Sequence, residues 1–128
     1  AAARRRIAEA YTAAFAGLQE IRTPVCRPDK QHAWHLYVIQ LELERLSVDR
    51  NGFIEALREQ NIGTSVHFIP LHLHPYYRDR FGYHEADFPR AAAAYRRIVS
   101  LPIYPDMTTA DVQDVVHAVT RTIERYRR

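Results

Sequence analysis

The fold of this chain is decided by a stretch in which apolar side chains alternate, His35-Leu36-Tyr37-Val38-Ile39-Gln40-Leu41-Glu42-Leu43. Alternation of this kind is typical of a β-strand, in which successive side chains point to opposite faces. One face carries His35, Tyr37, Ile39, Leu41 and Leu43, and we expect it to be buried. The other face is mixed, so we expect it to be only partly covered. On the buried face, His35 is expected to be a hydrogen-bonded core histidine.

Two segments on either side of this strand have the apolar spacing of amphipathic helices. The first has its apolar stripe within residues 7–18 and ends before Thr23-Pro24. The second spans roughly Asp49 to Asn61. Asp49 is a suitable N-cap for it, because a carboxylate there can accept hydrogen bonds from the first backbone N–H groups.

Two more helices are expected in the second half of the chain. One opens at Pro89, where the missing N–H costs nothing, and its apolar stripe extends to Ile98. The last has the strongest pattern, with apolar residues on one face across 112–126. Thr108 and Asp111 resemble a capping box at its start.

The remaining segments are extended or irregular. Residues 64–69 are rich in β-forming types and are halted by Pro70, so a short strand is expected there. Residues 71–86 are expected to be an irregular connection, long enough to be functional or mobile. Residues 101–105 contain two prolines, which allow at most an edge strand. The sequence therefore predicts an α+β fold, with a small, mainly antiparallel sheet covered by about four helices.

Length and composition indicate one ordinary globular domain. The chain has 128 residues, of which 47% are hydrophobic and 26% charged. No apolar run is long enough to span a membrane, and no signal-peptide core follows the N-terminal arginines. The single cysteine, Cys26, fits a reducing compartment, so we expect a cytoplasmic protein. The net charge is +3, and its arginine clusters at the two ends are expected to be solvated helix ends rather than a nucleic-acid site.

The sequence contains no recognisable self-contained active site. Seven histidines suggest a metal site, but their spacing matches no ligand signature, and we expect none. Cys26 has no activating partner in sequence, Ser65 and Ser100 lack an elbow motif, and the four glycines are isolated. We therefore expect no catalytic residue in this chain.

One segment combines aromatic rings with donors for anionic ligands: His67-Phe68-Ile69-Pro70-Leu71-His72-Leu73-His74-Pro75-Tyr76-Tyr77-Arg78. Imidazole and guanidinium groups suit phosphate and carboxylate oxygens. The same residues could equally be loop packing with tyrosine anchors. The residue types alone do not decide between an anion-binding segment and a packed loop.

Taken in order, four segments resemble the C-terminal part of the DegT/StrS-type sugar aminotransferases, a branch of the fold-type I enzymes that use pyridoxal phosphate (PLP). They are Arg5-Arg6-Ile7-Ala8 with Tyr11; His32 to Val38; Phe53 to Thr64 continuing into His67-Phe68-Ile69-Pro70-Leu71-His72 and Tyr76-Tyr77; and Phe88-Pro89 followed by Ser100 to Thr108. Together they cover nearly the whole chain, although no single motif is decisive.

The resemblance implies the small C-terminal domain of such an enzyme, with residues 1–22 as a helix linking it to a missing large domain and 23–128 as its body. It implies transfer of an amino group from glutamate to a ketosugar nucleotide, with PLP as cofactor and a homodimer as the working form. Lys30 is the only lysine, and its loop is unlike the family's cofactor-lysine context. The chain alone is therefore expected neither to hold PLP nor to transaminate.

The resemblance also implies that this domain closes over the substrate. His67 is its first candidate for substrate binding, and His72, Tyr77 and Arg78 are further candidates. No cofactor-binding residue is expected. Two alternatives remain at this point: a free-standing α+β binding or interaction module, and a histidine-based metal-binding domain.

Overall fold

A computed structural model describes residues 1–128. It contains five α-helices and three strands: α1 (Ala2–Phe15), β1 (Ile21–Arg22), β2 (Tyr37–Leu41), α2 (Arg50–Arg58), α3 (Pro75–Phe81), α4 (Pro89–Tyr95), β3 (Ile98–Leu101) and α5 (Thr109–Tyr126). Short 3-10 turns occupy Leu43–Arg45, Leu71–Leu73 and Glu85–Asp87. The predicted α+β class is confirmed.

The sheet is built around β2, the strand that the alternating pattern predicts. Its order is β1-β2-β3 and both pairings are antiparallel. On the inner face, Tyr37, Ile39 and Leu41 are 0% exposed, whereas Gln40 on the outer face is exposed. One face of the sheet is therefore buried, as expected from its alternation.

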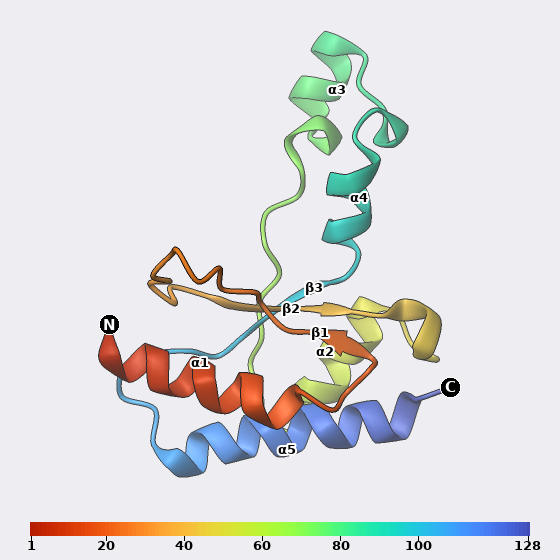
Figure 1. Cartoon of the computed structure of the whole chain (residues 1–128). Coiled ribbons are helices and arrows are strands. Elements are labelled where there is room, and N and C mark those ends of the chain that lie inside the picture. The colour runs from red at the N-terminus through yellow and green to blue at the C-terminus, as the bar shows by residue number, and fades with distance from the viewer.

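Helices α1, α2 and α5 supply most of the other side of the core (Figure 1). Helix α1 runs beside α5, and α5 also packs on α2. Their fully buried side chains include Ile7, Tyr11, Phe15, Phe53, Leu57, Val119 and Ile123. Residues 1–22 thus contribute a helix to the core and a strand to the sheet.

Local signals at two helix starts behave as predicted. The Asp49 carboxylate accepts a hydrogen bond from the backbone N–H of Gly52, 2.8 Å away. Thr108 and Asp111 form a reciprocal capping box, in which each side chain accepts from the other residue's backbone N–H. These bonds satisfy donors that a helix start otherwise leaves unpaired.

An arm formed by residues 67–96 stands away from this body (Figure 1). It holds α3 and α4, and its main contacts are internal: α3 packs on the 71–73 turn and α4 on the 85–87 turn. The prediction that 71–86 is irregular is therefore wrong. Pro75 occupies the first turn of α3, and Gly82 ends that helix with a left-handed φ of 67°.

Three further expectations are corrected. Residues 64–69 form no strand, because only Ser65 pairs, with Ser100, before the chain leaves as the arm. Ile98 belongs to β3 and not to the helix opened by Pro89, since it pairs with Gln40. His35 is exposed rather than buried. Trp34 beside it has a left-handed φ of 51°, so the extended strand begins only at Tyr37.

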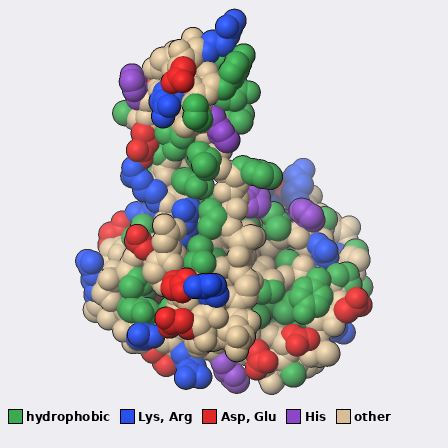
Figure 2. Space-filling view, turned by 180° about the vertical axis from the view of Figure 1, so that it is seen from behind, with side chains coloured by type: hydrophobic (Ala, Val, Ile, Leu, Met, Phe, Trp, Pro, Cys, Tyr) green, Lys and Arg blue, Asp and Glu red, His purple; other side chains and the backbone are tan.

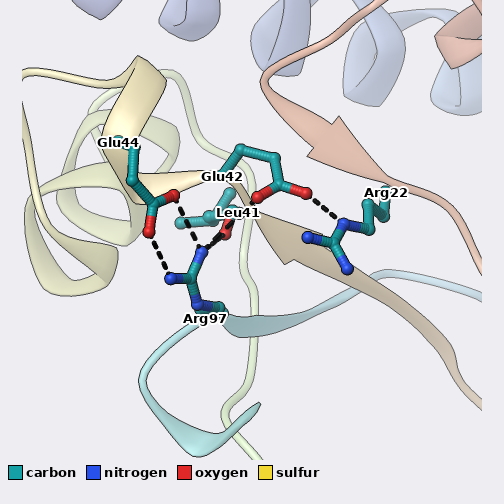
Figure 3. A network of polar contacts seen from close by, with 5 residues as sticks. All are labelled: Arg22, Leu41, Glu42, Glu44 and Arg97. Carbon is teal, nitrogen blue, oxygen red and sulfur yellow. Dashed lines mark hydrogen bonds and ion pairs between the residues drawn. The ribbon is translucent and has the colours of Figure 1, made fainter. Parts of the chain in front are cut away.

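A network of charged side chains fastens the end of the arm to the sheet (Figure 3). Arg97, just before β3, donates to the carbonyl of Leu41 and to the carboxylates of Glu42 and Glu44. Arg22 of β1 donates to Glu42 from the other side. The hydrogen bonds from Arg97 lower the pKa of Glu44 to about 2. The network links all three strands at the point where the chain returns from the arm.

Candidate functional site

His67, the first predicted substrate residue, lies at the root of the arm. Its side chain is exposed, and its nearest aromatic neighbour is Phe68, with ring centroids 6.4 Å apart. Two residues earlier, Ser65 is still bonded to Ser100 of β3. The sheet therefore fixes the backbone just before His67 and leaves its imidazole free to meet a ligand.

His72 has a different environment. It is 6% exposed, and its ring lies 4.9 Å from that of Phe88. Its Nε2 is buried without a hydrogen-bond partner. An imidazole in this position packs the inside of the arm, so it cannot reach a ligand unless the arm opens.

Tyr77 and Arg78 lie on α3, near the tip of the arm (Figure 1). The Tyr77 ring packs edge-on against Tyr76 and stacks on Phe81. Arg78 is exposed and pairs with Asp79, with 3.2 Å between Nε and Oδ1. No polar contact joins either residue to His67 or His72. The candidates therefore lie in three separate surroundings: the root of the arm, its inside and helix α3.

A hollow lies elsewhere, between α1 and the loop before β2. It measures about 640 Å³, and its polar lining includes Arg5, Glu9, Lys30 and His32. His32 Nδ1 accepts a hydrogen bond from the backbone N–H of Trp34, and Arg4 donates to the carbonyl oxygens of Trp34 and His35. The hollow was not predicted, because no local pattern relates residues 25 positions apart.

The structure also locates the groups considered for other chemistries. Cys26 is exposed, and its thiol lies 3.6 Å from the carbonyl oxygen of Lys30. No three His, Cys, Asp or Glu side chains gather in a way that could hold a metal ion. None of the helices is both long and apolar enough to cross a membrane.

The model of the DegT/DnrJ/EryC1/StrS aminotransferase family matches residues 1–120. The chain belongs to this family. The match covers the sheet, the whole arm and every helix except the last six residues of α5, so it excludes the alternative of a module with only architectural similarity.

Comparisons with individual proteins and solved structures support the family assignment. The spore coat polysaccharide biosynthesis protein SpsC of Bacillus subtilis is 51% identical over 117 residues, which are 91% of this chain and 30% of SpsC. DesV of S. venezuelae, solved in complex with a ketimine intermediate, is 32% identical and superposes with a TM-score of 0.86, covering 97% of this chain and 32% of DesV. NtdA of Bacillus subtilis, solved with bound cofactor PMP, is 26% identical with a TM-score of 0.79, covering 95% and 28% of the two chains.

Each of these matches covers nearly all of this chain but only about a third of the relative. The chain spans about a third of the length of the curated relatives that it matches. Within this family, the 128 residues thus correspond to the smaller part of the relatives, and its fold is that of the matching part of DesV.

Proposed function

We propose that this chain is the substrate-closing small domain of a PLP-dependent sugar aminotransferase. The whole enzyme would transfer an amino group from glutamate to a ketosugar nucleotide, as a cytoplasmic homodimer. Residues 1–22 would link the domain to the larger part. Three findings support this: the family match over 1–120, the similarity to SpsC and DesV, and the small share of the relatives' length that the chain spans. The exposed free thiol of Cys26 suits a reducing compartment.

The residues present do not fit PLP. A cofactor lysine needs a sheltered site with further groups for the phosphate and the ring. Lys30 instead has a side chain 70% exposed on a loop, 3.7 Å from the carboxylate of Asp29. The nearby hollow offers Arg5 and His32 but also Glu9. We therefore assign PLP to the rest of the enzyme and expect this chain alone to be inactive.

The observation that carries the substrate-closing role is the position of His67. It lies two residues after Ser65, which pairs with β3, so the backbone just before it is anchored, and its imidazole is exposed and makes no contact that would hold it in the core. A neutral imidazole donates one hydrogen bond, and a protonated one also attracts a phosphate. We propose that His67 binds a sugar or diphosphate oxygen of the substrate. Tyr77 and Arg78 are secondary candidates, and His72 would have to leave its buried position.

Steady-state kinetics of the full-length enzyme test this role. His67→Ala should lower kcat/KM for the ketosugar nucleotide roughly 10- to 100-fold, the effect of losing one hydrogen bond to a charged group. His67→Gln, which keeps a donor, should recover part of the loss. His117→Ala, an exposed histidine on α5, is the matched control. Unchanged kinetics in His67→Ala would remove His67 from the substrate site.

A further inference from the structure

The arm formed by residues 67–96 is braced from within. The Nε2 atom of His74 lies 3.1 Å from the carbonyl oxygen of Ile69, and Arg96 forms an ion pair with Glu85. Helices α3 and α4 pack on the turns next to them, and the arm stands clear of the body (Figure 2). The arm is therefore a stiff unit, and the angle at which it leaves the body decides where its outer side chains lie.

The chain enters the arm after one isolated pair of backbone hydrogen bonds. The N–H of Ser65 donates to the carbonyl oxygen of Ser100 at 3.1 Å, and the N–H of Ser100 donates back at 2.8 Å. Residues 66–69 donate no backbone hydrogen bond to the body. Because both bonds join the same two residues, they fix the position of Ser65 better than the direction of the chain that follows. Within this chain, the angle of the arm is therefore set where the chain returns.

The returning chain is held by an arginine of α2. Arg50 donates a hydrogen bond to the carbonyl oxygen of Tyr95, and its guanidinium lies 4.6 Å from the centroid of the Tyr95 ring. Two residues later, the carbonyl oxygen of Arg97 accepts from the N–H of Leu41 at 2.8 Å. A planar guanidinium that both donates to a carbonyl and lies over a ring has a defined orientation. Arg50 thus holds the backbone and the side chain of the residue at which α4 ends.

Arg50 is itself fixed to the core. It is the first residue of α2, and Phe53 and Leu57 of the same helix are fully buried. Arg50 is half-buried, and its Nε atom is buried without a hydrogen-bond partner. Burying part of a charged group and leaving a donor unpaired costs free energy. Helix α2 bears this cost where it reaches the arm, which favours a task for Arg50 beyond the stability of the helix.

We propose that Arg50 is a positioning residue, which sets the angle of the arm and so places its substrate-binding side chains. A rotation at the base of the arm displaces α3, farther out, more than it displaces the root (Figure 1). Tyr77 and Arg78 on α3 therefore depend on Arg50 more than His67 does. The effect on the substrate rests on the proposed function, whereas the hold of Arg50 on the arm does not.

Pulsed electron paramagnetic resonance on the full-length enzyme tests the hold on the arm. Nitroxide labels are placed at Arg80→Cys on α3 and Glu124→Cys on α5, with the other exposed cysteines, Cys26 among them, replaced by serine. An excess of unlabelled enzyme leaves one labelled chain in each assembly. The distribution of label-to-label distances should be clearly broader or shifted in Arg50→Ala, and Arg50→Lys, which keeps a cation over the ring, should recover part of the change.

The matched control is Arg58→Ala, which should leave the distances unchanged. Arg58 lies on the same helix but is exposed and pairs with Glu55 of that helix. A distribution in Arg50→Ala that equals that of the wild type overturns the proposal. That result includes the case in which the part of the enzyme outside this chain holds the arm instead. If Arg50→Ala does not fold, Arg50→Lys and Tyr95→Leu, which removes the ring and keeps the carbonyl, carry the same test.

Steady-state kinetics of the same variants test the positioning. Arg50→Ala should raise KM for the ketosugar nucleotide about 3- to 10-fold, because substrate contacts are weakened. Its kcat should change less than about twofold, because the cofactor is held outside this chain. A changed distance with unchanged KM overturns the positioning role. If His67→Ala is then silent as well, the proposed function fails with it, whereas an effect of His67→Ala limits the failure to Arg50.

Discussion

At the scale of single residues, Tyr11 connects the first helix to the end of the sheet. Its hydroxyl donates to the carbonyl oxygen of Pro102 at 2.8 Å, and its ring is fully buried against Phe15 and Tyr37. Burial raises the pKa of the Tyr11 phenol, so it stays a neutral donor at ordinary pH. We predict that Tyr11→Phe lowers the free energy of unfolding by about 1–2 kcal/mol in urea denaturation, because the carbonyl loses its donor.

Tyr126→Phe is the control for that measurement. Tyr126 is half-buried beside the same core, but its hydroxyl makes no hydrogen bond. Its removal should leave the free energy of unfolding nearly unchanged. Equal losses in the two variants would mean that the Tyr11–Pro102 bond contributes nothing.

Glu44 is a second single residue with a testable effect, because it makes the thermal stability of the chain depend on pH in the acidic range. The side-chain hydrogen bonds from Arg97 lower its pKa from 4.5 to about 2 in the folded chain. Because the pKa of Glu44 is lower in the folded chain than in the unfolded chain, its ionised carboxylate stabilises the fold at any pH above the unfolded pKa. This stabilisation is lost as the pH falls from the unfolded pKa to the folded pKa. The Tm should therefore drop between about pH 4.5 and 2, and less steeply in Glu44→Gln. The side chain is 67% exposed, so salt should weaken the effect.

The matched control is Glu124→Gln, because Glu124 is an exposed carboxylate that makes no ion pair. Thermal unfolding followed by circular dichroism at each pH gives both curves. A Glu44→Gln profile parallel to that of the wild type would contradict the assigned coupling to Arg97.

At the scale of elements, the cap of α5 is the feature that both sequence and structure specify. The Thr108 hydroxyl accepts from the backbone N–H of Asp111 at 3.1 Å. Thr108→Ala should destabilise the chain by about 1 kcal/mol in urea denaturation, because that donor loses its partner. Thr109→Ala, one residue into the helix, removes a hydroxyl without a capping bond and should cost little. A larger effect at Thr109 than at Thr108 would refute the cap.

The helices and the strand that could be predicted from the sequence were predictable for the same physical reason. Helices α1, α2 and α5 and strand β2 carry apolar patterns that match their own period, and these patterns are local. Helix α3 was missed because its seven residues bury no side chain and so leave no stripe, although Pro75 and Gly82 marked its ends. His35 was misplaced because alternation alone does not reveal the left-handed turn at Trp34 that delays the strand.

At the scale of the whole molecule, the family could be predicted from the sequence, whereas the arrangement of the candidate site could not. His67, His72, Tyr77 and Arg78 are close in sequence, but the 71–73 turn buries His72, and the short helix α3 places Tyr77 and Arg78 farther out on the arm than His67. The hollow beside Lys30 joins residues of α1 to a distant loop, and only the folded chain brings them together. The spacing of residues along the sequence indicates local secondary structure, but it does not indicate which distant segments come into contact in the fold.

The central claim is that this domain closes over substrate while the cofactor is held elsewhere. Its most direct test is the absorbance spectrum of the isolated chain mixed with an equimolar amount of PLP. We predict the spectrum of free PLP, the same as that of Lys30→Ala mixed with PLP, since Lys30 is exposed and lacks the surroundings of a cofactor lysine. An internal-aldimine band that appears with the wild-type chain and disappears in Lys30→Ala would contradict the account.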